Sequence, residues 1–134
     1  MKYPNPLASS AQARPTHPAL LSEGLTLSYG ELATEVAKCA GGYAESGIRR
    51  GDRVGILATY DSHWVVAFHA IGWLGAAVVP FSPKLSPDEL LEQARAANIQ
   101  FLVVGGGFES ITQSFPYPLV GVRELGAAKA PALW

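Results

Sequence analysis

The sequence predicts an α/β fold in which a parallel sheet carries helices on both faces, with the elements from Leu25 to Val104 in the order βαβαβαβ. Two patterns and the length of the chain predict it. Short continuous apolar runs, such as residues 53–58, are typical of strands that are buried on both faces. These runs alternate with segments of helical periodicity that begin at capping residues. The chain has 134 residues, which is the length of one domain.

The first residues of the chain are expected to lie outside this α/β unit. Residues 1–18 contain four prolines among small and polar residues, so they are expected to form an irregular leader. Residues 19–22 and 25–27 flank a Glu-Gly dipeptide, and a two-residue connection of this kind favours a β-hairpin. The α/β unit is expected over residues 19–126, and residues 127–134 are expected to form a tail.

The first helix of the unit is predicted to begin after Ser28. This residue is followed three positions later by Glu31, and the S-x-x-E spacing is that of a capping box. Gly47 is expected to end the helix in a left-handed conformation. The apolar residues between these points recur at the helical period and predict one buried face: Leu32, Val36, Cys39, Ala40 and Tyr43.

The next three elements are a strand, a helix and a strand. Residues 53–58 and 76–80 are the strands, and residues 63–74 are the helix, with Asp61 or Ser62 as its N-cap.

A second capping box, with proline at the first helical position, opens a further helix at residues 86–89. This helix is expected to end at Asn98, before a strand at residues 101–104. Beyond that point the pattern weakens to a short helix at residues 108–114 and a strand at residues 119–122.

The middle helix has an unusual composition, because nearly every side of residues 64–74 is apolar. A helix on the surface of a small domain normally carries a polar stripe. We therefore expect further protein, either more of the same polypeptide or another subunit, to cover this helix. The apolar stretch at residues 65–81 is not expected to span a membrane, because His69 lies inside it and Pro80 ends it.

Composition excludes several classes of protein. The chain has 10 Lys and Arg against 11 Asp and Glu, so it has no basic surface suited to nucleic acid. Cys39 is the single cysteine, which excludes an intrachain disulfide framework and fits a reducing compartment. The first residues lack the apolar segment of a signal peptide. A cytoplasmic location is therefore expected.

Ligands of open α/β sheets bind outside the carboxyl ends of the strands. In this chain those loops are residues 59–62, 82–85 and 105–107. The third loop is a glycine triplet that could approach a phosphate, but it matches neither G-x-G-x-x-G nor the P-loop. A flexible connector is the simpler interpretation.

Other polar side chains are better explained by structure than by chemistry. Asp61 and Ser62 are expected to cap a helix, and His63 and His69 lie about 240° apart around a helix, too far for one metal ion. The remaining candidates are a core thiol, a solvated basic turn, a histidine in the leader and two core or interface rings: Cys39, Arg49, Arg50, Arg53, His17, Trp64 and Trp73. We expect no catalytic, cofactor-binding or metal-binding residue in this chain.

Six segments between residues 25 and 104 form a recognisable succession: LSYGEL (27–32), GIRRGDRV (47–54), HWVVAFHA (63–70), LGA (74–76), VPFSP (79–83) and DEL (88–90). In order and spacing they resemble the opening of the adenylate-forming acyl-CoA ligases, which are AMP-binding enzymes. The short leader is similar to that of compact members such as the o-succinylbenzoate–CoA ligases of menaquinone synthesis. The resemblance implies the N-terminal subdomain of the acyl-CoA synthetase fold.

The resemblance also implies an activity. These enzymes join a carboxylic acid to ATP, which gives an acyl-adenylate and pyrophosphate, and then transfer the acyl group to coenzyme A. The complete enzyme would therefore need ATP, Mg and coenzyme A. The phosphate loop, the nucleotide-binding residues and the catalytic lysine of the family lie beyond the resembling region. The chain is thus expected to be an N-terminal fragment that is inactive and binds none of these ligands by itself.

Two other interpretations remain open at this point. The chain could be a stand-alone flavodoxin-like module that binds or dimerises without catalysis and buries the apolar helix in its dimer. It could also be a regulatory paralogue that docks onto an intact ligase.

Overall fold

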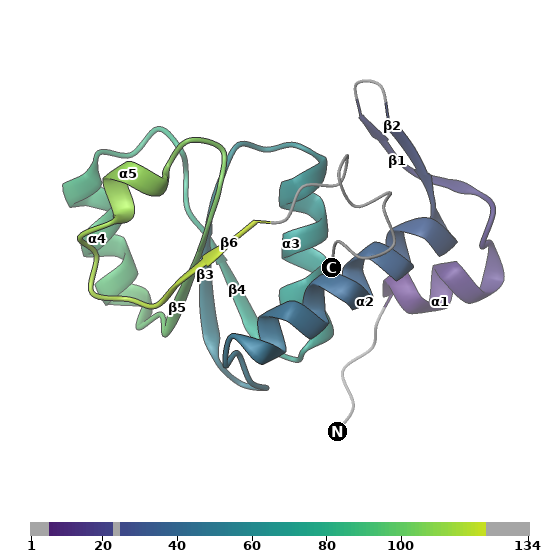
Figure 1. Ribbon diagram of the computed structural model, residues 1–134, viewed down its shortest axis with the longest axis horizontal. Helices are drawn as coiled ribbons and strands as arrows, with labels where there is room; N and C mark the ends of the chain where they lie inside the picture. The colour runs from purple at the N-terminus through teal and green to yellow at the C-terminus, as the bar shows by residue number, and fades with distance from the viewer. Residues whose placement is uncertain (1–5, 23–24, 123–134) are drawn as a thin grey trace.

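The computed structural model describes residues 6–22 and 25–122, and these form two sheets (Figure 1). The smaller sheet is an antiparallel hairpin of β1 (Pro18–Ser22) and β2 (Leu25–Ser28). The larger sheet is parallel throughout and has the order β4-β3-β5-β6. Its strands are β3 (Arg53–Leu57), β4 (Ala77–Pro80), β5 (Phe101–Val104) and β6 (Leu119–Gly121).

Helices cover both faces of the parallel sheet, which confirms the predicted fold class. In Figure 1, α2 and α3 lie on one side of the sheet and α4 and α5 on the other, while α1 packs beside α2. The helices are α1 (Pro6–Ala13), α2 (Tyr29–Glu45), α3 (Ser62–Trp73), α4 (Pro87–Ala97) and α5 (Glu109–Thr112).

Two expectations differ from the structure. The predicted series of strands began at Leu25, but β2 pairs only with β1, and the fourth parallel strand is β6. The hairpin partner is adjacent in sequence, so β2 is paired before the long helix α2 begins. The expected irregular leader contains α1, which packs against α2 through the buried Leu7. The predicted tail at residues 127–134 lies outside the described residues.

The side chains of the parallel strands alternate between two separate cores. In β3, Val54 and Ile56 belong to the core beneath α2 and α3, whereas Leu57 belongs to the core beneath α4. In β5, Val103 faces the first core, and Leu102 faces the second. This period of two, with apolar residues on both faces, explains why these strands read as continuous apolar runs.

The helix boundaries follow from the predicted caps. Ser28 and Glu31 form the reciprocal bonds of a capping box, and so do the corresponding residues that open α4. Asp61, rather than Ser62, caps α3, because its Oδ1 accepts a hydrogen bond from the backbone N–H of Trp64 at 3.1 Å. Asn98 ends α4 with φ 53°, a left-handed conformation that asparagine tolerates.

The middle helix α3 is buried on one side only. Val66, Ala67, Ala70 and Ile71 are fully buried against α2 and the sheet, while its other large side chains stay half-buried. Within the described residues, no helix is both long and apolar enough to cross a membrane.

Candidate functional site

The carboxyl ends of β3 and β5 lie directly against each other. The backbone N–H of Gly105 donates to the carbonyl of Leu57 at 3.1 Å, so pairing continues to the last residue of β3. A Cβ on Gly106, which has φ 64°, would lie only 2.7 Å from Oγ1 of Thr59 and 2.8 Å from its backbone nitrogen. Glycine is therefore required at this position by both backbone conformation and space. The first and third predicted loops thus meet at the carboxyl end of the parallel sheet.

The glycine triplet does not present an open anion site. The backbone N–H of Gly107 donates to Oε1 of Glu109 at 3.1 Å. A carboxylate of the chain itself thus takes the position that a phosphate oxygen would need. This geometry favours the interpretation of residues 105–107 as a connector.

The second loop is held by short-range hydrogen bonds. The hydroxyl of Ser82 accepts a hydrogen bond from the backbone N–H of Lys84 at 3.2 Å. At the start of α4, Oε1 of Glu89 accepts a hydrogen bond from the backbone N–H of Ser86 at 2.9 Å. This backbone hydrogen bond, together with the hydroxyl of Ser86, lowers the pKa of Glu89 below its ordinary value of 4.5. Lys84 is the single cationic side chain in the three loops.

The first loop carries the residues that sequence reasoning assigned to helix capping. Asp61 caps α3, and its Oδ2 lies 3.6 Å from Nδ1 of His63. Ser62 is buried at the start of the helix. His69 lies further along α3, where burial lowers the pKa of its imidazole and so favours the neutral form. The structure does not bring the two histidines together.

The remaining candidates have structural contacts. Arg49 donates through Nη1 to the carbonyl of Ala44 at 2.7 Å and so satisfies the C-terminal turn of α2. Arg53 donates through Nε to the carbonyl of Asn98 at 2.7 Å. Cys39 is buried on the inner side of α2.

Sequence reasoning missed one arrangement, a ladder of aromatic rings along the outer side of α3. Tyr60 meets Trp64 edge-on with centroids 5.2 Å apart, and Trp64 stacks on Phe68 at 5.1 Å. Tyr60 is 61% exposed, and the indole N–H of Trp64 has no acceptor among the described residues. The four-residue spacing of Trp64 and Phe68 could have indicated their stacking, because such residues lie on one side of a helix.

Taken together, the edge formed by these loops does not fit ATP and a metal ion. A triphosphate needs several cationic or backbone donors around it, whereas the loops offer one lysine and a glycine loop whose Gly107 N–H is already bonded. No group of three or more His, Cys, Asp and Glu side chains in the described ranges could hold a metal ion.

Comparison with known proteins gives a consistent result. Residues 7–131 match the family described as AMP-binding enzyme. The chain is 32% identical over 124 residues to the 2-succinylbenzoate–CoA ligase of Bacillus subtilis, covering 92% of this chain and 26% of that protein. It is 27% identical to surfactin synthase subunit 2 of the same organism, covering 88% of this chain and 3% of that protein.

The structural comparison agrees. The fold superposes with a TM-score of 0.85 and 31% identity on the o-succinylbenzoate coenzyme A synthetase of Bacillus subtilis solved in complex with ATP and magnesium ion, covering 90% of this chain and 33% of that one. The chain therefore spans about a quarter of the length of the first ligase and a third of the solved chain.

Proposed function

The chain belongs to the AMP-binding enzyme family, and on this premise we propose that it is the N-terminal part of an ATP-dependent carboxylic acid–CoA ligase. Such an enzyme would form an acyl-adenylate and pyrophosphate and then transfer the acyl group to the thiol of coenzyme A. The observation that carries the proposal is the superposition of nearly the whole described fold on one third of a synthetase that binds ATP and magnesium ion.

The acid that we propose is 2-succinylbenzoate, so the ligase would act in menaquinone synthesis. This choice is supported by the ligase and the synthetase of Bacillus subtilis, both of which carry that acid in their names and are 30% identical or more to this chain.

By itself, the chain is proposed to be inactive and to bind neither ATP, Mg nor coenzyme A. Its part in the ligase would be to supply a rigid sheet whose loops support residues from elsewhere. The single lysine in the loops and the bond from Gly107 to Glu109 support this assignment.

The proposed partner is the remainder of the ligase chain, which would cover the outer side of α3. Trp64, Phe68 and Trp73 are half-buried there. Further protein that excluded water from these rings would lower the free energy of the assembly. A second subunit is the other occupant that this surface would accept. The proposed place of action is the cytoplasm, where the nucleotide and coenzyme A would be available.

The decisive experiment is ATP–pyrophosphate exchange with two proteins. One is the 134-residue chain, and the other is a chimera in which this chain replaces the matched region of the Bacillus subtilis ligase. We expect no exchange above the blank for the chain alone and exchange dependent on 2-succinylbenzoate for the chimera. Exchange by the chain alone would overturn its inactivity, and a folded chimera without activity would count against the proposed role.

Sedimentation velocity of the 134-residue chain separates the other interpretations. A discrete, stable dimer would favour a flavodoxin-like module that buries α3 between two copies. A tight complex with an intact ligase in dilute solution would favour a regulatory paralogue. The proposed fragment predicts neither of these species.

A further inference from the structure

The two ends of the parallel sheet differ in charge. Beyond the carboxyl ends of the strands, the three loops and the helix starts that follow them carry one lysine and four acidic residues: Lys84, Asp61, Asp88, Glu89 and Glu109. At the amino ends, the last turns of α2 and α4 and the residues up to the start of β3 carry four arginines and two acidic residues: Arg49, Arg50, Arg53, Arg95, Glu45 and Asp52. The amino end is therefore the basic end of the sheet.

A cleft of about 440 Å³ opens at this basic end. Its lining, which defines it here as the arginine cleft, consists of Arg53, Arg95, Asn98, Ile99 and Tyr117. These residues come from the start of β3, the end of α4, the link from α4 to β5 and the segment before β6. The fold thus brings two guanidinium groups from distant parts of the chain to one cleft, and no carboxylate of the described residues lines it.

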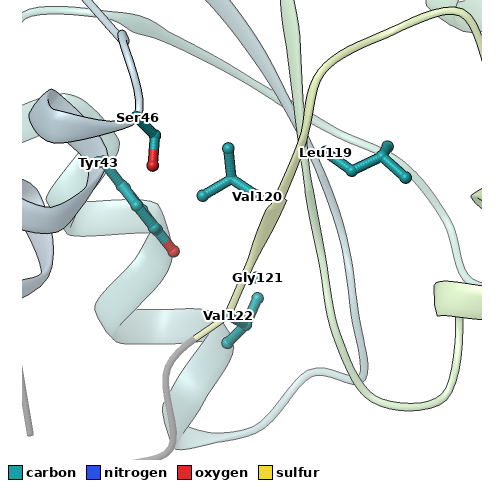
Figure 2. Close-up of a pocket in the computed structure, with 6 residues that line it drawn as sticks. All are labelled: Tyr43, Ser46, Leu119, Val120, Gly121 and Val122. Carbon is teal, nitrogen blue, oxygen red and sulfur yellow. The ribbon is translucent and has the colours of Figure 1, made fainter.

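A second cleft, of about 350 Å³, lies beside the edge strand β6 and has a different lining. Figure 2 shows Val120 directed across it toward Tyr43 and Ser46 of α2. None of the described residues that line it carries a charge, and no strand within the described ranges pairs with the far side of β6. This lining selects no class of small ligand, whereas two guanidinium groups select an anion.

The side chain of Arg53 is fixed without a ligand. Its Nε donates to the carbonyl of Asn98 at 2.7 Å, and its backbone N–H donates to Oε1 of Gln100 at 2.9 Å. The backbone N–H of Gln100 donates in return to the carbonyl of Arg53 at 2.7 Å. A guanidinium has five N–H donors, so the bond from Nε leaves the Nη groups to a ligand. A side chain held in this way loses little conformational entropy when an anion binds.

Neither arginine of the cleft is neutralised by the chain. Within the part of the chain that the structure describes, neither guanidinium forms an ion pair with Asp or Glu. The neighbouring carboxylate of Asp52 accepts a hydrogen bond from the backbone N–H of Arg49 at 2.7 Å instead. Two like charges at one cleft repel each other. A ligand with two negative charges would relieve this repulsion, and one with a single negative charge would do so only in part.

We propose that the arginine cleft binds a small organic dicarboxylate, with one carboxylate on each guanidinium. A planar carboxylate pairs with a guanidinium through two parallel hydrogen bonds. The buried Ile99 and the half-buried ring of Tyr117 give the cleft an apolar wall for the carbon body of the ligand. This wall favours an organic dianion over an inorganic one. The site goes beyond the proposed function, which requires no ligand at the amino end of the sheet.

The test is a titration of the 134-residue chain with 2-succinylbenzoate, followed through the NMR signals of the backbone amides. This probe has two carboxylates and an aromatic ring, and only its choice rests on the proposed function. We expect saturable shifts at residues 53, 95–100 and 117, with a dissociation constant of about 1 mM or below. Benzoate, which has one carboxylate, should bind about tenfold more weakly. Shifts centred on the loops at the carboxyl end would overturn the site.

Arg95→Gln is the main variant, because this side chain is exposed and bonds to none of the described residues. It should weaken binding of 2-succinylbenzoate by about tenfold without lowering the melting temperature of the chain. Arg95→Lys should restore only part of the affinity, because an ammonium group does not form the paired hydrogen bonds. The matched control is Arg14→Gln, which removes the same charge from an exposed position after α1 and should leave the affinity within about twofold.

Each other outcome contradicts the proposal. Equal losses for Arg95→Gln and Arg14→Gln would show that only the overall charge attracts the ligand. Tighter binding of inorganic pyrophosphate at the same residues would show that the cleft takes a phosphate rather than a dicarboxylate. The absence of saturable shifts up to about 20 mM would mean that no site is present. Since all these measurements use the 134-residue chain, an inactive ligase chimera would leave the site standing, and a failed titration would leave the proposed function standing.

Discussion

The helices α3 and α4 lie on opposite faces of one sheet, yet only α4 has a surface suited to water. On their inner sides the two are alike, with Ile71 and Leu90 both buried. On its outer side α4 carries exposed charged and amide groups, whereas α3 carries half-buried aromatic and aliphatic ones. The buried residues of each helix thus show how it packs in this domain. The residues on its outer side show whether that side is suited to water.

The largest expected effects come from the inner sides, where the two helices should behave alike. Ile71→Ala in α3 and Leu90→Ala in α4 each remove a side chain that is at most 2% exposed, so each should lower the free energy of unfolding by about 2–5 kcal/mol. Urea denaturation of the 134-residue chain measures both. A loss under 1 kcal/mol for Ile71→Ala alone would mean that α3 is only loosely packed in the isolated chain.

A smaller effect on the free energy of unfolding is expected at Gly55 of β3, which lies beneath α4. A Cβ at this position would lie 2.5 Å from Cε2 of Phe81 and 3.0 Å from Cδ1 of Leu102. Gly55→Ala should therefore destabilise the chain by about 1–3 kcal/mol through overpacking.

The matched control is Gly72→Ala in α3, where a Cβ meets no atom within 4 Å. This change should be stabilising by about 0.5–1 kcal/mol, because alanine is favoured over glycine inside a helix. Equal effects of the two substitutions in the same denaturation series would contradict the tight packing beneath α4.

The start of α4 should give a pH-dependent contribution to the free energy of unfolding. Hydrogen bonds from Ser86 lower the pKa of Glu89 from its ordinary value of 4.5, so the unfolded state binds this proton more tightly than the folded state. The stabilisation is therefore present above about pH 4.5 and is lost as the pH falls through the lower folded-state pKa. Melting temperatures of the parent and Glu89→Gln should converge in acid, and a constant difference from pH 7 to 3 would contradict the assignment.

The smallest effect on stability is expected on the outer side of α3. Tyr60 is 61% exposed, so Tyr60→Ser should change the free energy of unfolding by less than about 0.5 kcal/mol. It should, however, reduce concentration-dependent association of the isolated chain, because it removes one ring of the aromatic ladder. Light scattering against Gln93→Ser, on the outer side of α4, provides the comparison.

Local chemistry made most of the fold predictable. The boxes at Ser28 and Ser86, the end of α4 at Asn98 and the apolar runs of β3 and β5 each act over a few residues, and the structure confirms them. The apolar composition of the outer side of α3 was evident in the sequence, and its cover by further protein stays a prediction. The resemblance to the AMP-binding enzymes rested on a succession of short segments, and the family match confirms it.

The features that escaped prediction depend on distant contacts. The helix α1 forms where prolines suggested a leader, because Leu7 is buried in the core beneath α2. The strand β2 pairs with β1 and not with the parallel sheet. Hydrophobic periodicity can predict a strand, but it does not predict which strand will be its partner. The approach of Gly106 to Thr59 joins segments almost fifty residues apart, so the sequence of neither loop predicts this contact.

The open edge of β6 has a consequence for synthesis of the proposed ligase on the ribosome. The β3–α3–β4 unit emerges before β5 and β6, and its outer strand ends at Pro80, which has no N–H to offer a further strand. No strand among the described residues pairs with the far side of β6, so this edge would then stay exposed until residues made later cover it. At about 5–20 residues per second, completing a relative-sized chain takes roughly 20 to 70 s. The nascent chain would need a chaperone, or the ribosome itself, to keep neighbouring chains away from this edge during that interval.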